Sequence, residues 1–303
     1  MVQTNSPGIS GLAGKERLLE VARNYTLLND VFMKYALDDI AACQHVIRII
    51  TGKLDLVVKH VRSQYHISEL TFHDAVLDIL AEDSEGRLYN LEIQRANTVD
   101  HARRCRFYSA MVDTRFLPKG TSYAEMPDVY IIYISESDIW RGGKTTYKVI
   151  KALGQPSVPY NDGQHIIYVN AAVDDGSATA ALMQYFKTSD PDDMSQGDLS
   201  ARVHLIKREK GGREILCKVT DEIYQYGFKA GEAKGEARGE ARGEARGKAQ
   251  GEAIGEARGK AQGEAMGILL VARNMKRMAA FSDEDIARAT NLPLEQVKAL
   301  KIN

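Results

Sequence analysis

Alternating apolar and polar positions predict a β-hairpin between residues 75 and 94. Residues 75–83 (AVLDILAED) form the first predicted strand, and residues 87–94 (RLYNLEIQ) form the return strand. The intervening residues 84–86 (SEG) are typical of a turn. The pattern therefore predicts two adjacent antiparallel strands, whose side chains alternate between the two faces of a sheet.

The elements around the hairpin predict an α/β fold. Helical patterns cover residues 30–50 and 98–116, and a strand pattern covers residues 127–135. The order helix, strand, strand, helix, strand indicates a core with a mixed sheet flanked by helices. A further strand at 164–170 and a helix at 178–186 are interpreted as elaborations of the same domain.

Glycine recurs every four residues from about residue 227 to 267, in a Gly-Glu-Ala-Arg repeat with Lys, Gln, Ile and Met variants. On a helix this period drifts by ~40° per repeat, so each residue type winds around the axis. Each glycine costs ~1 kcal/mol relative to alanine, and equal charges four residues apart repel each other. We favour a solvated helical spacer that frays. Close approach of two such helices, giving a homo-oligomer through the repeat tail, stays open.

The C-terminal segment predicts a small helical hairpin. Residues 268–280 have helical periodicity, and Ser282 is a good N-cap for a second helix. The sequence Asn291-Leu-Pro293 ends that helix, and residues 294–300 begin another. We interpret the hairpin as a packing or interaction unit rather than a reader of DNA sequence, because it lacks a basic recognition face.

Composition is compatible with a cytoplasmic protein. The 303 residues include three scattered cysteines and carry a formal net charge of −1. An odd number of cysteines argues against a disulfide framework and suits a reducing compartment. We expect no membrane segment and no secretory signal. The predicted domains are an N-terminal extension (1–24), an α/β domain (25–226), the repeat spacer (227–267) and the helical hairpin (268–303).

Asp78, Glu92 and Gln94 are the candidate catalytic residues of the predicted hairpin. Glu92 and Gln94 share a face of their strand because they are two residues apart. Asp78 joins them only if it pairs opposite Glu92, and a slip of one residue would place Leu91 there instead. The sequence leaves this register open.

Two carboxylates at one point suit a divalent metal. Mg²⁺ prefers oxygen ligands, and one or two carboxylates plus waters and a substrate phosphate commonly complete its shell. The same reasoning admits Mn²⁺. Gln94 is uncharged and cannot act as a general base, so its role would be to orient or polarise a water. The alternative is a polar strand end at Asp78 and a solvated face at Glu92.

Basic residues gather on both sides of the hairpin. Those that follow it are candidates for contacting DNA phosphates, because lysine and arginine supply most sequence-independent affinity for DNA. The alternative for this helix is a solvated face. The basic residues before the hairpin are Lys53, Lys59, His60 and Arg62, and those after it are Arg95, Arg103, Arg104, Arg106 and Arg115.

Six segments follow one another in a characteristic order along the chain: 29–34 (NDVFMK), 76–83 (VLDILAED), 86–94 (GRLYNLEIQ), 103–108 (RRCRFY), 127–135 (PDVYIIYIS) and 166–170 (IIYVN). Their order resembles the PD-(D/E)XK nuclease superfamily, specifically the Rpn family of recombination-promoting nucleases and transposases. The resemblance covers roughly residues 25–230, and the order is more specific than any single motif.

The resemblance implies a restriction-endonuclease-like core with Asp78 and Glu92 as metal ligands. In this family Glu-x-Gln commonly stands where other members have Glu-x-Lys, which places Gln94 at the lysine position. Members often add an acid from the first helix, for which Asp38 and Asp39 are the candidates here. The implied function is a metal-dependent DNA endonuclease that promotes recombination or transposition. The alternative is a catalytically inactive, nuclease-derived protein for DNA binding or assembly.

Overall fold

The computed structural model describes residues 12–67, 75–94, 100–154 and 158–301. The chain divides into two compact units, residues 1–226 and 227–303. The strands are β1 (Val58–Ile67), β2 (Ala75–Asp83), β3 (Leu88–Gln94), β4 (Val129–Ser135), β5 (Thr146–Lys148), β6 (Ala152–Leu153), β7 (Val158–Pro159) and β8 (Gln164–Asn170). The helices are α1 (Leu12–Arg23), α2 (Asp30–Leu37), α3 (Ile40–Thr51), α4 (His101–Phe116), α5 (Ala178–Lys187), α6 (Gly197–Arg208), α7 (Arg213–Arg277), α8 (Asp283–Thr290) and α9 (Leu294–Lys298), with two short 3₁₀ turns at Tyr123–Glu125 and Lys210–Gly212.

A mixed six-stranded sheet forms the centre of the first unit, in the order β1-β2-β3-β4-β8-β5. β1, β2 and β3 are antiparallel neighbours, whereas β3, β4 and β8 run parallel. Both predicted hairpin strands are confirmed, and β1 is an additional strand that the sequence patterns did not reveal. The predicted α/β class with a mixed sheet is confirmed as well.

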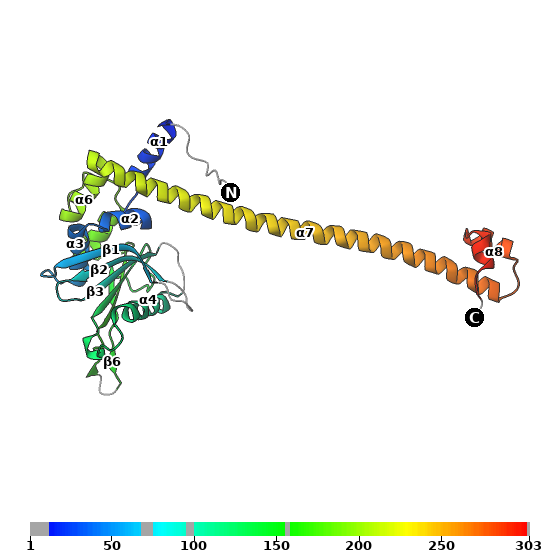
Figure 1. Ribbon diagram of the computed structural model, residues 1–303, viewed down its shortest axis with the longest axis horizontal. Helices are drawn as coiled ribbons and strands as arrows, with labels where there is room; N and C mark the ends of the chain where they lie inside the picture. Colours follow the sequence, from blue (N-terminus) through cyan, green and yellow to red (C-terminus); the bar gives the residue numbers. More distant parts are fainter. Residues whose placement is uncertain (1–11, 68–74, 95–99, 155–157, 302–303) are drawn as a thin grey trace. The chain divides into compact units, whose positions relative to one another are not determined.

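Helices cover both faces of the sheet (Figure 1). On one face, α2, α3, α5 and α6 pack with odd-numbered residues of β3 such as Tyr89 and Leu91 in the larger core cluster. On the other face, α4 packs over Leu88, Ile131 and Tyr133. β3 and β4 are buried on both faces, as expected for central strands that run parallel to each other. Polar residues on β3 are therefore enclosed by the fold.

The predicted helix over residues 30–50 is two helices. α2 ends at Leu37, and α3 begins at Ile40 with Asp39 as its N-cap. The Asp39 carboxylate accepts a hydrogen bond of 3.0 Å from the Ala42 N–H, which satisfies one of the free donors of the first turn. The acidic pair thus marks a helix boundary, a role that uniform helical periodicity across the segment concealed.

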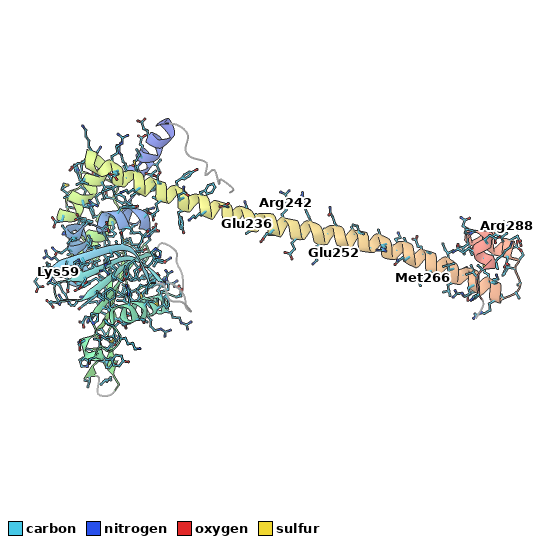
Figure 2. All side chains as sticks on the ribbon, in the orientation of Figure 1. Lys59, Glu236, Arg242, Glu252, Met266 and Arg288 are labelled. Atoms are coloured by element: carbon cyan, nitrogen blue, oxygen red, sulfur yellow. The ribbon has the colours of Figure 1, made fainter. Side chains whose placement is uncertain are left out.

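The repeat forms a continuous part of α7, and its side chains from Gly231 to Ile268 are exposed. Figure 2 shows Glu236, Arg242 and Glu252 projecting from the helix. Beyond the repeat, the end of α7 packs with α8 and α9 around Ala272, Ile286 and Val297. The predicted N-cap at the start of α8 is confirmed, because the Ser282 side chain and Asp285 form a capping box.

Candidate active site

Asp78 and Glu92 lie where β2 and β3 separate. The ladder between the two strands pairs Glu82 with Leu88 and ends at Ile79 opposite Leu91. Continuing it by one step places Asp78 opposite Glu92. This is the register that the metal-site hypothesis requires, because a slip by one residue would have put Asp78 opposite Leu91.

The two carboxylates replace the ladder hydrogen bonds at this point. The Asp78 N–H donates to Glu92 Oε1 at 3.2 Å, and the Ile93 N–H donates to Asp78 Oδ2 at 3.2 Å. Each acidic side chain therefore reaches across to the backbone of the opposite strand. The exchange holds both carboxylates at the same gap in the sheet and satisfies backbone donors that would otherwise be unpaired.

On one side of the gap, Asp78 meets helix α2. The Lys34 Nζ lies 3.5 Å from Asp78 Oδ1, and the two side chains are only 12% and 16% exposed. Burial raises the pKa of Asp78, and the nearby Asp30 raises it further, whereas Lys34 and the Ile93 N–H lower it. Asp30 and Lys34 lie one turn apart on α2, where Asn29 caps the helix by accepting from the Phe32 N–H.

On the other side, Glu92 points toward helix α4. It is 5% exposed, and its pKa is raised to about 8, first by burial and then by the charge of Asp78. The Asp78 N–H, the Asn90 amide and the Arg104 guanidinium favour the ionised form without offsetting burial. Arg104 itself donates from Nη2 to Tyr108 Oη at 2.9 Å. Burial and the neighbouring Asp78 charge therefore both oppose ionisation of Glu92.

Asn90 lies two residues before Glu92 on the same face of β3 and is fully buried. Neither its amide nitrogen nor its amide oxygen has a hydrogen-bond partner among the described residues. Its amide favours ionised Glu92 electrostatically, although the two groups do not reach hydrogen-bond geometry. A buried amide without partners costs about 1–3 kcal/mol, so Asn90 leaves unused hydrogen-bonding groups on the same face of β3 as Glu92.

This donor set fits a hard divalent cation. Asp78 and Glu92 supply carboxylate oxygens, and a cation between them would counteract the burial and the repulsion that raise the pKa of Glu92. The orphan amide of Asn90 extends the polar surroundings of the pair. The described residues contain no group of three or more His, Cys, Asp or Glu side chains able to share a metal. Waters and a substrate phosphate commonly complete the shell of such an ion.

The candidate acids of the first helical segment lie at helix ends. Asp39 caps α3, and the Asp38 carboxylate accepts from Ser63 Oγ at 3.0 Å. Neither appears among the charges that shift Asp78 or Glu92, whereas Asp30 does. Asp30 is thus the acid of this helical segment that stands among the main causes raising the pKa of Asp78.

The other predicted site residues differ in how far their side chains are exposed to solvent. Gln94 is the last residue of β3, half-buried and paired with Ser135 of β4. Arg104 is half-buried beside Glu92, whereas Arg103 and Arg106 are exposed on α4. Arg95, also predicted to contact DNA, lies outside the described residues.

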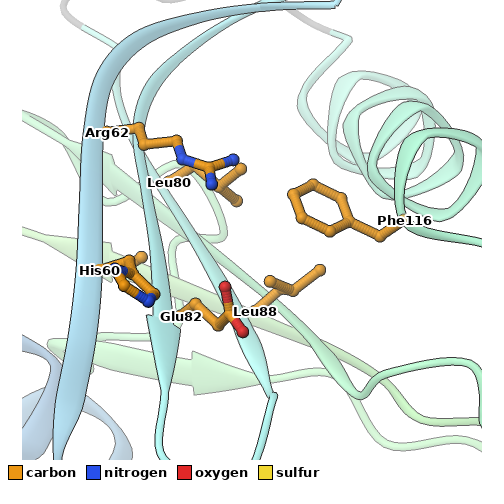
Figure 3. A pocket seen from close by; sticks show the side chains of 7 residues that line it. His60, Arg62, Leu80, Glu82, Leu88 and Phe116 are labelled. Carbon is orange, nitrogen blue, oxygen red and sulfur yellow. The ribbon is translucent and has the colours of Figure 1, made fainter.

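A shallow depression lies on the sheet away from the carboxylate pair (Figure 3). Its volume is only about 10 Å³, so it offers no room for a nucleotide. Glu82 and Leu88, which line it, belong to the turn end of the hairpin, whereas Asp78 and Glu92 lie at the opposite end. The side chains that Figure 3 labels are His60, Arg62, Leu80, Glu82, Leu88 and Phe116.

One comparison with known proteins found a match for part of the chain. Residues 57–172 match the family described as PD-(D/E)XK nuclease family transposase. The resemblance drawn from the motifs is confirmed for this segment, which holds every strand of the sheet and α4. The mixed sheet with flanking helices, followed here by the long α7, is compatible with the fold class that the resemblance implies. No curated protein and no solved structure matches the chain.

Sequence reasoning missed Lys34, Asp30 and Asn90 as members of the site. Lys34 carried one available signal, since it interrupts an apolar helix face formed by Phe32, Met33 and Ala36. A lysine among buried positions needs a buried partner. Asn90 carried a similar signal as an amide inside a strand that is otherwise enclosed. Which partner each would find depended on the packing of α2 and α4.

Proposed function

We propose that this protein is a metal-dependent DNA endonuclease that hydrolyses phosphodiester bonds and promotes recombination or transposition. The observation that carries the proposal is the buried Asp78–Glu92 pair at the end of the hairpin, within the segment that matches a nuclease-transposase family. Asp78 and Glu92 would hold Mg²⁺ or Mn²⁺. The bound ion would supply activation of water and stabilisation of charge on the phosphate.

The protein's own side chains complete the proposed chemistry. Gln94, two residues beyond Glu92, would orient the attacking water through its amide. Lys34 would place a positive charge beside Asp78, at a site where the strand itself carries glutamine instead of lysine. Arg104 would hold the substrate phosphate near Glu92, and Arg95, Arg103 and Arg106 would contact the DNA backbone farther out.

The proposed partner is DNA, and the proposed location is the cytoplasm, for which the free thiols of Cys43, Cys105 and Cys217 are suited. Among the described residues, no helix is both long and apolar enough to cross a membrane. Association of two chains through the exposed repeat of α7 is a further part of the proposal, because the repeat alone has weak intrinsic helix stability.

The test is cleavage of supercoiled plasmid by the full chain with Mg²⁺, with Mn²⁺ and with chelator. The Asp78→Ala/Glu92→Ala variant is compared with Glu82→Gln, which removes a carboxylate from the other end of the same hairpin. Metal-dependent nicking or linearisation that is lost only in the double variant would support the proposal. Equal cleavage by the folded double variant would refute it.

A second candidate function is a nuclease-derived DNA-binding or assembly protein without turnover. Gln94 at the position of the usual lysine favours it. It predicts that folded wild-type protein retards DNA without metal, with an affinity that falls steeply with salt. Absence of cleavage under all three metal conditions, together with such binding, would favour this candidate.

A further inference from the structure

The side-chain alternation of β1 is interrupted at Gln64. This residue has a φ of 49°, a left-handed conformation that is uncommon outside glycine. In a regular strand, residues three apart point to opposite faces. Here Arg62 and Tyr65 share a face, because the Arg62 guanidinium carbon lies 5.4 Å from the centroid of the Tyr65 ring. Tyr65 packs against the core cluster on the α4 side, to which Leu80 belongs.

The end of α4 brings a second arginine to the same tyrosine. Arg115 Nε donates to Tyr65 Oη at 3.0 Å, and the rings of Tyr65 and Phe116 lie 6.3 Å apart. Tyr65 is half-buried, whereas Arg62 and Arg115 are exposed. One ring therefore positions two solvent-facing guanidinium groups that come from different elements.

The charges of this cluster are available to a ligand. Within the described part of the chain, neither Arg62 nor Arg115 forms an ion pair with a carboxylate. Figure 3 shows Arg62 extended over Leu80 on the side of the sheet that carries Phe116. The acidic Glu82 lies beside this surface, paired in register with His60. Arg62 and His60 thus line one depression together with a single carboxylate, that of Glu82.

The tyrosine of this cluster lies on β1, next to the β2 residues of the candidate active site. Tyr65 pairs with Leu77, the residue directly before Asp78, and Arg62 pairs with Leu80. Resting on the proposed nuclease function, we propose that Arg62, Tyr65 and Arg115 form a second binding surface for the sugar–phosphate backbone of the DNA substrate. Guanidinium groups bind phosphate oxygens through paired N–H donors, and the tyrosine limits their freedom before binding. The left-handed Gln64 is the feature that assembles the surface, since it turns Tyr65 toward Arg62.

The test measures equilibrium binding of the full chain to fluorescein-labelled duplex DNA by anisotropy, in chelator and over a series of NaCl concentrations. The variants are Arg62→Gln, Arg115→Gln and their combination. Arg213→Gln is the matched control, an exposed arginine at the start of α7, whose Leu216 and Val219 pack in the core cluster on the other face. We expect the slope of log K against log salt to become shallower by about 1 for each arginine removed, with no change for the control.

A fourth variant tests the role of the tyrosine. Tyr65→Phe keeps the ring beside Arg62 but removes the oxygen that accepts from Arg115. It should weaken DNA binding, and it should add little to Arg115→Gln because both changes disrupt the same contact. Additive effects would contradict positioning by the hydroxyl.

The outcomes separate this surface from the proposed catalysis. Unchanged binding in the Arg62/Arg115 double variant, or an equal loss in Arg213→Gln, would overturn the surface even if the wild type cleaves plasmid. A selective loss in protein that never cleaves would support the surface while refuting the nuclease. A wild type that binds no DNA would overturn both.

Discussion

Replacing Glu92 by glutamine tests how much the ionised Glu92 carboxylate destabilises the folded protein. The folded protein raises the pKa of Glu92 from 4.5 to about 8. One pKa unit is worth about 1.4 kcal/mol, so keeping Glu92 ionised in the metal-free fold costs up to about 5 kcal/mol. Glutamine keeps the shape of the side chain but carries no charge, so it removes this cost.

The sign of the effect follows from the direction of the shift. Because the folded pKa lies above the unfolded one, the contribution of protonated Glu92 is fully present below pH 4.5. It is lost as the pH rises to about 8. Without metal, Glu92→Gln should therefore gain stability over the wild type progressively between pH 4.5 and 8. Mg²⁺ should reduce this difference in unfolding free energy, because it stabilises only the protein that retains both carboxylates.

Urea denaturation in chelator at pH 5, 6, 7 and 8 measures the difference in unfolding free energy between Glu92→Gln and the wild type. Trp140 is the only tryptophan and lies 5.1 Å from the ring of Tyr168, so its fluorescence reports on the first unit rather than on the repeat. Glu82→Gln controls for the loss of one negative charge from the hairpin. A stability difference that stays constant across this pH range, or that increases equally in the control, would refute the burial of Glu92 beside Asp78.

Three further predictions follow from neighbouring contacts. Lys34→Met should lower the free energy of unfolding at neutral pH by about 2 kcal/mol in urea denaturation, because it leaves the buried Asp78 carboxylate without its cation; an unchanged value would contradict the pair. Because the Asp39 carboxylate caps α3, Asp39→Ala should lower the free energy of unfolding by about 1 kcal/mol and Asp39→Ser should hardly change it. Both variants should retain plasmid cleavage. Loss of cleavage in Asp39→Ser would instead indicate that Asp39 is a metal ligand. Gly239→Ala with Gly243→Ala should increase helicity by circular dichroism and slow amide exchange in the repeat, because nothing lies within 4 Å of the added methyl groups and each glycine costs about 1 kcal/mol; unchanged exchange would contradict a helix limited by glycine.

Local sequence patterns predicted the β-hairpin of β2 and β3 and the C-terminal helical hairpin well. Strand alternation located β2 and β3, and the Ser282 N-cap located the start of α8, because both signals arise from residues adjacent in the chain. The same reasoning missed the helix boundary at Asp38 and Asp39, because the apolar residues of α2 and α3 together have the periodicity of one continuous helix. It also missed β1, where Gln64 interrupts the alternation that marks a strand.

The candidate site was likewise predictable only in part. Asp78, Glu92 and Gln94 were recognisable because two short strands joined by a turn must run side by side. Their register and their electrostatics were not recognisable. Whether Asp78 faces Glu92 or Leu91 depends on how the hairpin packs into the sheet, and the pKa of Glu92 depends on how completely α4 buries it.

The sequence by itself determined the elements of this protein, namely a carboxylate-bearing hairpin, a four-residue repeat that runs within one helix and a capped helical pair at the end. These follow from side-chain periodicity, capping and turn chemistry, which act over a few residues. Only the tertiary structure decided that Lys34 meets Asp78, that Arg104 and Asn90 adjoin Glu92, and that Tyr65 joins Arg62 to Arg115. The physical reason is that these contacts join segments distant in the chain, and burial and charge coupling arise only when the whole sheet and its helices have packed.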